Sequence, residues 1–462
     1  MKALLCKFSL IYVALILFTG CHIAESKEVV FDLALSDFEP SSLRWVDFPG
    51  NSVHINEEYN SEISICLEDE NGMKKLLIFS SPVLFQDSQG LWQPIDTRLR
   101  NVTDAQKLSE GYIYQTANSD ITAYYPLRLE QEKGIRIERS DVLEYGISTD
   151  RSFFSHYVQT ANFSGETQAG VRYEEPFGSE TELVVYPTSL GARNEVVLKS
   201  GDFNDIRLWL RADGYRLKAE PGGYLLLLND EKDKDGNEQI AGIIHSPLMK
   251  DQRGEISINS RLEFESQDGM ETMLRVIPDT EFLSNKDVQY PVFVSFDIEW
   301  RREKQPDTQV FSGKPNLNAY LRNYTLIGNH PEYGESQCYI RYQFFDIFGL
   351  DPESIQSAEL VTSQLTKTPL SATLHPVSKD WCSLTSNWKK KAPYERMAIS
   401  QQKTSLGEVH FDITEIVKKY VQDKSGELQR NGLLLKSEEE NFSILTSADS
   451  SLYPMRTEII LK

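Results

Sequence analysis

The chain has 462 residues, with 69 acidic and 48 basic side chains and a formal net charge of −21. A chain of this length exceeds one ordinary hydrophobic core, so we expect two or three domains. The acidic charge is spread along the chain without a basic stripe, which makes nucleic acid and anionic membrane surfaces poor partners. The composition fits a neutral or cationic ligand, or simply solubility outside the cell.

Residues 1–21 carry an export pattern. A basic start precedes an apolar run that is too short to span a bilayer and ends in small residues before Cys21, as in secretory signal peptides. The sequence Leu17-Phe18-Thr19-Gly20-Cys21 resembles the lipobox of bacterial lipoproteins, and this resemblance implies that Cys21 becomes the acylated first residue. An ordinary signal peptide or a single membrane anchor is the alternative. We therefore expect an exported protein, anchored by lipid in a bacterial cell envelope, with residues 22–40 as a tether.

The remaining chain predicts an all-β fold. Its apolar runs are of strand length and are separated by turn signals, and the segment 292–298 alternates apolar and other residues at period two. Two passages share one pattern, a proline followed by a D-x-x-G turn: Pro82 with Asp87–Gly90, and Pro247 with Asp251–Gly254. Each predicts a hairpin.

A charged, proline-ended stretch at 300–306 predicts a boundary between two parts of the chain. We expect an N-terminal β-rich region over 41–300, with a further break near residue 200 if it forms two subdomains. The C-terminal part, 305–462, contains one helix, predicted over 412–421. Its apolar residues fall on one face, and Asp412 with Glu415 forms a capping box.

The N-terminal region resembles the opening β segment of large bacterial surface proteins of the Rhs and wall-associated type. The resemblance is carried by the passage from Ser80 to Leu99, with its D-x-x-G turn, tryptophan and I-D-x-x-L ending, and by Tyr290-Pro-Val-Phe-Val-Ser-Phe-Asp297. The long toxin-encapsulating repeat region of Rhs proteins does not follow. The shared part is therefore the N-terminal scaffold.

The C-terminal part resembles DNRLRE-type domains, which are grouped with carbohydrate-binding modules. Six features occur in the family's order: Asp307–Val310; Arg341–Phe345; Ile355–Leu360; Trp381 with Asn387-Trp388 and Pro393; Asp412-Ile-Thr with its helix; and Asn431–Leu435. The resemblance implies a jelly-roll β-sandwich that binds polysaccharide or another surface component.

Carbohydrate recognition needs aromatic faces that stack on sugar rings and polar groups that reach the hydroxyls. The predicted ligand-binding residues are Tyr320, Arg322, Tyr324, Tyr333 and Trp388. The polar surroundings of Tyr320, Arg322 and Tyr324 predict that these three side chains point outward. For Trp388, as for Trp381, packing within the sandwich competes with ligand stacking.

Metal and disulfide chemistry have little support in the sequence. The segment from Glu231 to Glu238 echoes the start of an EF-hand, with Asp233 and Asp235 as calcium candidates, but a solvated acidic hairpin is the competing interpretation because Gly242 stands where the bidentate glutamate belongs. Beyond the signal, the cysteines are Cys66, Cys338 and Cys382. They allow one disulfide, with Cys338–Cys382 as our choice, or three unpaired buried thiols.

These observations predict a non-enzymatic cell-envelope lipoprotein whose C-terminal domain binds polysaccharide or a surface component. We expect no cofactor other than the calcium ion considered above. A structural protein-interaction module is the alternative, and an exposed apolar patch flanking 339–348 would favour it. A polysaccharide-degrading enzyme is a third hypothesis, which requires convergent acid, base or metal groups. No catalytic residue can be named from the sequence.

Overall fold

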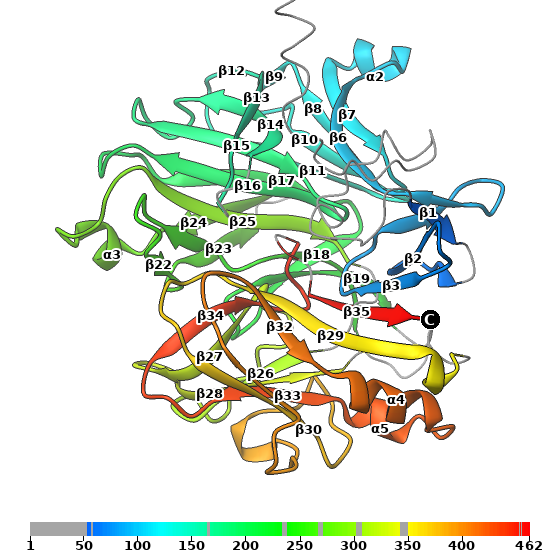
Figure 1. Ribbon diagram of the computed structural model, residues 1–462. Helices are drawn as coiled ribbons and strands as arrows, with labels where there is room; N and C mark the ends of the chain where they lie inside the picture. The colour runs from blue at the N-terminus through cyan, green and yellow to red at the C-terminus, as the bar shows by residue number, and fades with distance from the viewer. Residues whose placement is uncertain are drawn as a thin grey trace, which may run out of the picture.

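The computed structural model describes residues 53–56, 59–163, 167–232, 238–266, 271–301, 307–341, 350–451, 453 and 455–462. The signal segment, Cys21, the tether, and the calcium candidates Asp233 and Asp235 lie outside these residues. The described strands pair antiparallel, in two large β assemblies stacked one above the other in Figure 1. The fold is all-β, as predicted. Among the described helices, none has the length and apolar character to cross a membrane.

The upper assembly in Figure 1, which we call the N-terminal sandwich, consists of two facing sheets over residues 96–300. The eight-stranded sheet contains, in order, β23 (Arg261–Ser266), β24 (Glu271–Ile277), β17 (Ile206–Arg211), β11 (Val142–Ile147), β10 (Ile135–Glu138), β8 (Thr122–Pro126), β7 (Tyr112–Asn118) and β6 (Asp96–Asn101). The ten-stranded sheet contains β13 (His156–Ala161), β14 (Thr167–Glu174), β15 (Thr181–Pro187), β16 (Gly191–Leu198), β25 (Val292–Trp300), β20 (Glu238–Ile244), β19 (Leu225–Lys232) and β18 (Tyr215–Ala219). In addition, β21 (Leu248–Lys250) pairs with β25, and β22 (Ile256–Ser257) pairs with β21.

One hydrophobic core fills the space between these two sheets. Residues from both sides of position 200, such as Val196 and Leu208, belong to this core. The predicted break near residue 200 therefore falls inside a single sandwich, where the chain passes from β16 in one sheet to β17 in the other.

Strand β25 confirms the predicted period of two. Its residues 292, 294, 296, 298 and 300 are buried in the core. The residues between them, Phe293, Ser295, Asp297 and Glu299, face the other side of the ten-stranded sheet, because successive side chains of a strand alternate. We call that side the outer face. One groove and one buried charge network described below lie on it.

The lower assembly, the C-terminal sandwich, is a single 13-stranded sheet whose halves enclose a second core. Its strands in order are β1 (Val53–Asn56), β2 (Ser64–Asp69), β3 (Lys74–Phe79), β35 (Arg456–Leu461), β29 (Ile355–Gln364), β34 (Phe442–Thr446), β27 (Tyr324–His330), β28 (Gly334–Ile340), β33 (Leu433–Ser437), β30 (Ser371–Pro376) and β31 (Ser400–Lys403), with β26 (Asp307–Phe311) on β28 and β32 (Gly407–Asp412) on β29.

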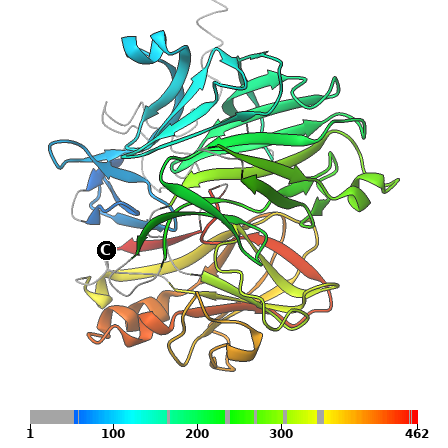
Figure 2. The same cartoon turned by 180° about the vertical axis from the view of Figure 1, so that it is seen from behind.

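The first three strands belong to the C-terminal sandwich, although the sequence placed them in the N-terminal region. Strand β3 pairs with the last strand, β35, from Lys74↔Leu461 to Phe79↔Arg456. Leu76 and Ile78 are fully buried in the C-terminal core. Figure 1 shows these blue strands beside the red C-terminal strand, and Figure 2 shows the same from behind. The division at residue 300 is therefore wrong for residues 53–79.

Four short helices and several small elements complete the described structure. They are α2 (Ala105–Ser109), α3 (Thr280–Ser284), α4 (Thr414–Gln422), α5 (Glu427–Asn431), the 3-10 turns η3 (Pro352–Ser354) and η4 (Trp388–Lys390), and the strand pairs β4 (Leu84–Gln86) with β5 (Trp92–Pro94) and β9 (Arg128–Leu129) with β12 (Phe153–Phe154). Helix α4 is the predicted one. Val417 and Tyr420 pack into the core. The predicted capping box is wrong, because the helix begins one residue later than expected: its N-cap is Ile413, which makes no side-chain capping hydrogen bond, and Asp412 Oδ1 accepts from Thr414 N at 2.9 Å.

Both predicted D-x-x-G hairpins are present. Asp87 Oδ1 accepts from Leu91 N at 3.0 Å in the turn between β4 and β5, and Asp251 Oδ1 accepts from Glu255 N at 2.9 Å in the turn between β21 and β22. The glycines have φ near +80°, a conformation that side chains disfavour. The aspartate and the glycine together therefore define each turn.

The predicted disulfide is absent from the structure. Cys66 and Cys338 are buried thiols in the C-terminal core, whereas Cys382 is exposed. Burial raises the pKa of the Cys338 thiol well above its usual value. The choice of Cys338–Cys382 is wrong because one partner lies inside the core and the other outside it.

Candidate functional site

Four of the five predicted ligand residues come together, but as a junction between the sandwiches. The Arg322 guanidinium donates from Nε to the carbonyl oxygen of Gly222 at 2.8 Å and from Nη2 to the Tyr333 hydroxyl at 3.2 Å. Its Cζ lies 5.0 to 5.5 Å from the ring centroids of Phe311, Tyr324 and Tyr333. An arginine of the C-terminal sandwich is thus enclosed by aromatic rings and bound to the N-terminal sandwich.

The prediction that these side chains point outward is wrong for two of them. Arg322 is 3% exposed and Tyr324 is 1% exposed. Tyr320 is half-buried and meets Tyr224 of the N-terminal sandwich edge to face, with ring centroids 6.2 Å apart. Burial raises the pKa of Tyr320 and of Tyr324 to about 12. These residues hold the two sandwiches together and offer no open stacking face.

Trp388 belongs to a different cluster. It is half-buried beside the buried Trp381, Tyr339 and Val377, and Lys391 Nζ lies 3.2 Å from the centroid of its ring. Trp381 donates from Nε1 to the carbonyl oxygen of Asn431 at 2.9 Å. For both tryptophans the structure favours packing within the sandwich.

A groove opens on the outer face of the ten-stranded sheet, at the end that the C-terminal sandwich leaves uncovered. Its volume is about 480 Å³. The floor is apolar: Val184, Tyr186 and Val197 are buried side chains that pack with half-buried Val158 and Phe293. Tyr290 and Pro291, which lead into β25, line one side. An apolar floor of this size with a few polar groups is typical of small-ligand sites.

Charged side chains line the same groove. Lys199 Nζ and Glu182 Oε1 form an ion pair at 2.7 Å, and Arg172 Nη2 lies 3.2 Å from Glu174 Oε1. Arg172, Glu182 and Lys199 come from three adjacent strands or their ends. The groove therefore combines half-buried aromatic rings with acidic and basic groups, the two requirements for holding a sugar.

The sequence contained a signal for this groove that our prediction did not use. In the alternating strand 292–300, Phe293 is a bulky apolar residue at a position where the pattern places side chains facing away from the core. An apolar residue on the second face of such a strand indicates a covered face or a ligand site. The remaining groove residues lie on β13 to β16 and cannot be assembled from spacing alone.

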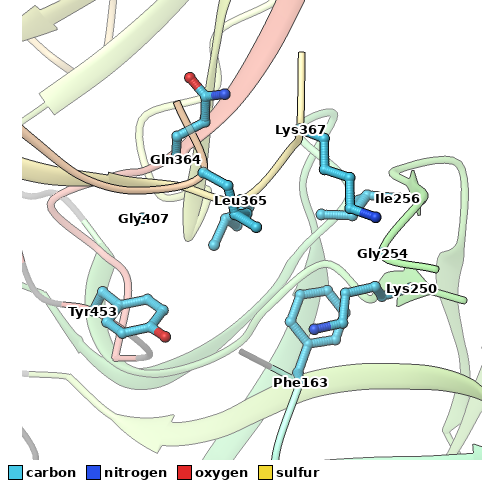
Figure 3. A pocket seen from close by; sticks show the side chains of 10 residues that line it. Phe163, Lys250, Gly254, Ile256, Gln364, Leu365, Lys367, Gly407 and Tyr453 are labelled. Carbon is cyan, nitrogen blue, oxygen red and sulfur yellow. The ribbon is translucent and has the colours of Figure 1, made fainter. Parts of the chain in front are cut away.

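A smaller pocket lies where the two sandwiches meet (Figure 3). Its volume is about 130 Å³. Phe163, Lys250 and Ile256 line it from the N-terminal sandwich, and Leu365 and Lys367 line it from the C-terminal one. Burial lowers the pKa of Lys250, whose Nζ lies 4.8 Å from the centroid of the Phe163 ring.

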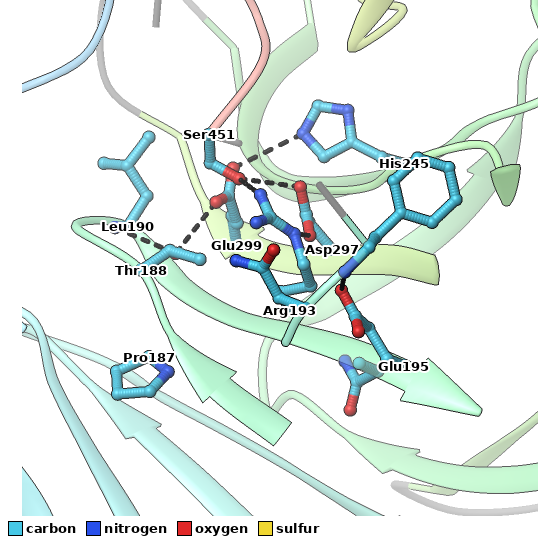
Figure 4. Close-up of polar contacts among 12 residues, drawn as sticks. Pro187, Thr188, Leu190, Arg193, Glu195, His245, Asp297, Glu299 and Ser451 are labelled. Carbon is cyan, nitrogen blue, oxygen red and sulfur yellow. Dashed lines mark hydrogen bonds and ion pairs between the residues drawn. The ribbon is translucent and has the colours of Figure 1, made fainter. Parts of the chain in front are cut away.

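The outer face of β16 and β25 carries a buried charge network (Figure 4). Arg193 donates from Nε to Asp297 Oδ1 at 3.0 Å and from Nη2 to Ser451 Oγ at 2.9 Å, and Ser451 donates to Asp297 Oδ2 at 2.7 Å. Glu299 accepts from Thr188 Oγ1 at 2.9 Å and lies 3.4 Å from His245 Nε2. Ser451 belongs to the C-terminal sandwich, so the network fixes how the two sandwiches meet.

Glu195 is a further buried carboxyl on this face. Burial raises its pKa to about 7, although the Arg193 guanidinium and the hydrogen bond from Phe163 N at 2.7 Å oppose the rise. The glutamate therefore connects the charge network to Phe163, which lines the pocket between the sandwiches.

No protein-family model matches the chain, and no curated protein matches it. Among solved structures, a protein crystallised with a xylogluco-oligosaccharide is similar to the chain at 6% identity, over 84% of this chain and 95% of that one, with a TM-score of 0.12. Likeness at that level carries no argument about fold or ligand. The resemblances to DNRLRE-type domains and to Rhs proteins therefore stay predictions.

Proposed function

We propose that this protein is an exported, non-enzymatic, lipid-anchored component of a bacterial cell envelope that binds polysaccharide. The main support for polysaccharide binding is the groove of about 480 Å³ on the outer face of the ten-stranded sheet, which has an apolar floor and charged sides. The lipid anchor at Cys21 and the export rest on the sequence pattern of residues 1–21.

The proposal places the sugar on the N-terminal sandwich and not at the predicted C-terminal residues. Phe293 and Tyr290 are half-buried and supply ring surface for the apolar face of a sugar. Arg172 and Lys199 donate to sugar hydroxyls, and Glu182 accepts from them. Because both acidic and basic groups line the groove, we expect a neutral or weakly charged glycan to bind.

Affinity electrophoresis tests this proposal. The full chain would be run through gels that contain neutral and anionic polysaccharides, beside variants F293A and K199A. We expect retardation by one glycan class and its loss in both variants. Because Lys199 is exposed, K199A should leave the fold intact, and a loss of retardation in this variant would then be a loss of binding. Y157A is the matched control, because Tyr157 is an exposed aromatic of β13 that does not line this groove.

The same experiment has outcomes that contradict the proposal. Full retardation of both variants would remove the groove as the site, and no retardation by any glycan would remove the function. Release of new reducing ends from the retained glycan would show an enzyme instead.

A second function, a protein-interaction module, has one observation in its favour. Helices α4 and α5 and the segment before β31 border a groove of about 290 Å³, where Met397 is 79% exposed and Leu428 is 42% exposed. Three acidic residues and one basic residue line it: Glu395, Asp412, Glu415 and Lys419. This groove suits an apolar segment flanked by basic residues. The patch expected at 339–348 gives no support, since Tyr339 and Ile340 are buried and 342–349 lie outside the described residues.

A further inference from the structure

We propose that the pocket between the two sandwiches is a second ligand site, which takes a small carboxylate, such as a single uronic acid, through Lys250 and Lys367. This site is separate from the glycan groove and does not depend on it. It is lined by residues of both sandwiches, the kind of place where ligand sites concentrate.

Lys250 is the first reason. It is half-buried at the end of β21, and its Nζ lies over the Phe163 ring at 4.8 Å. Within the described residues, no hydrogen bond or ion pair holds this ammonium, and the Glu195 carboxyl acts on it through space. Removing an ammonium from water without a partner costs free energy. An anion in the pocket would supply that partner.

Lys367 is the second reason. It belongs to the C-terminal sandwich, and its Nζ donates to the carbonyl oxygen of Arg253 in the hairpin that follows β21. That contact places the ammonium at the pocket and uses one of its three N–H donors. Figure 3 shows the Lys250 and Lys367 side chains on the same side of the pocket. Two ammonium groups on one side favour an anion there.

The shape of the pocket limits the rest of the ligand. Its volume of about 130 Å³ is far above the roughly 10–15 Å³ that one water requires. Phe163 lies beneath the Lys250 ammonium, Leu365 and Tyr453 also line the pocket, and Figure 3 shows Tyr453 on the side away from the two lysines. The ligand therefore has one anionic end and a compact carbon frame, which describes a monosaccharide acid better than a polymer.

Calorimetric titration of the full chain tests the site with glucuronate, galacturonate, glucose, acetate and inorganic phosphate. We expect a uronate to bind, glucose not to bind, and the affinity for the uronate to fall about tenfold or more in K250M and in K367M. K286M is the control, because Lys286 is exposed and does not line the pocket. If K250M does not fold, K250Q replaces it.

The alternative results overturn the proposal. No binding of any anion, or equal affinity in wild type and K250M, removes the site. Tighter binding of phosphate than of either uronate removes the carboxylate assignment. The glycan-groove variant K199A separates the two proposals, since it should lose glycan retardation while its uronate affinity stays unchanged.

Discussion

Lys75 and Glu458, which are 383 positions apart in the chain, form a nearly buried ion pair with 2.7 Å between Nζ and Oε2. They lie on the paired strands β3 and β35, so the first three strands of the described chain extend the sheet of the C-terminal sandwich. Arg456, on the same strand as Glu458, donates from Nε to Glu458 Oε1 at 2.7 Å. The C-terminal sandwich is therefore built from both ends of the described chain.

This connection predicts that residues 305–462 do not form a stable domain alone. Without β3, the hydrogen-bonding edge of β35 is exposed. The core side chains that Leu76 and Ile78 cover are exposed as well. We expect the fragment to aggregate or to melt without cooperativity, as followed by circular dichroism. Co-expression of residues 53–80 should restore a cooperative transition, whereas the same segment with L76D and I78D should not. A cooperative transition of the fragment alone would contradict the prediction.

The junction at Arg322 predicts a loss of stability without a loss of binding. In R322A the Gly222 carbonyl and the Tyr333 hydroxyl lose their donor inside a buried contact. We expect the free energy of unfolding to fall by about 2–4 kcal/mol in urea titrations. R261A is the control, because Arg261 and Glu263 form an exposed pair, and its change should stay within about 0.5 kcal/mol. Normal stability with lost glycan binding would instead make Arg322 a ligand residue.

The contacts of His410 should make the free energy of unfolding fall as the pH rises into the alkaline range. His410 Nδ1 lies 2.9 Å from Glu359 Oε2, and its Nε2 lies 3.3 Å from Glu408 Oε2. The hydrogen bond with Glu408, and after it the one with Glu359, raises the pKa of His410 from 6.5 to about 9. A raised pKa in the folded state means that the contribution is fully present below about pH 6.5 and is lost as the pH rises through about 9. H410Q should therefore be less stable than wild type at pH 6, with the difference gone at pH 10. A difference in melting temperature that is constant with pH would refute this assignment.

Glu195 should give a stability change of the same sign as His410, but between acid and neutral pH. Burial raises the pKa of its carboxyl from an ordinary value of 4.5 to about 7, so the folded protein binds the proton more tightly than the unfolded chain. Stability from this group therefore falls as the pH rises from about 4.5 through 7. E195Q keeps an oxygen for Phe163 N and removes the charge. We expect its gain in unfolding free energy over wild type to be larger at pH 8 than at pH 5, and an equal gain at both would contradict this.

Local patterns in the sequence predicted local structure well. The alternation of 292–298 gave the buried and outer faces of β25, since a strand reverses its side chains at every residue. The Asp87 and Asp251 turns were recognisable because aspartate and glycine each have a definite backbone role there. Helix α4 followed from its apolar period.

Long-range contacts were not predictable by the same means. Arg322 sits in a polar, aromatic stretch that resembles an exposed loop, yet its main partner is Gly222, 100 residues earlier. The assignment of 53–79 failed for the same reason, because nothing in strand β3 identifies β35 as its neighbour. A single sequence specifies which residues form a strand more clearly than which strand lies beside it.

The pairing of β3 with β35 also determines how the protein would respond to mechanical load. Tension on the chain ahead of Val53 would pass through β1 and β2 into β3, and from there into the closing strand of the C-terminal sandwich. With a glycan held in the groove of the N-terminal sandwich as the second attachment, the load would then cross from the C-terminal sandwich to the N-terminal one. The pairing of β3 with β35 would therefore meet the load before the sheet that carries the glycan groove.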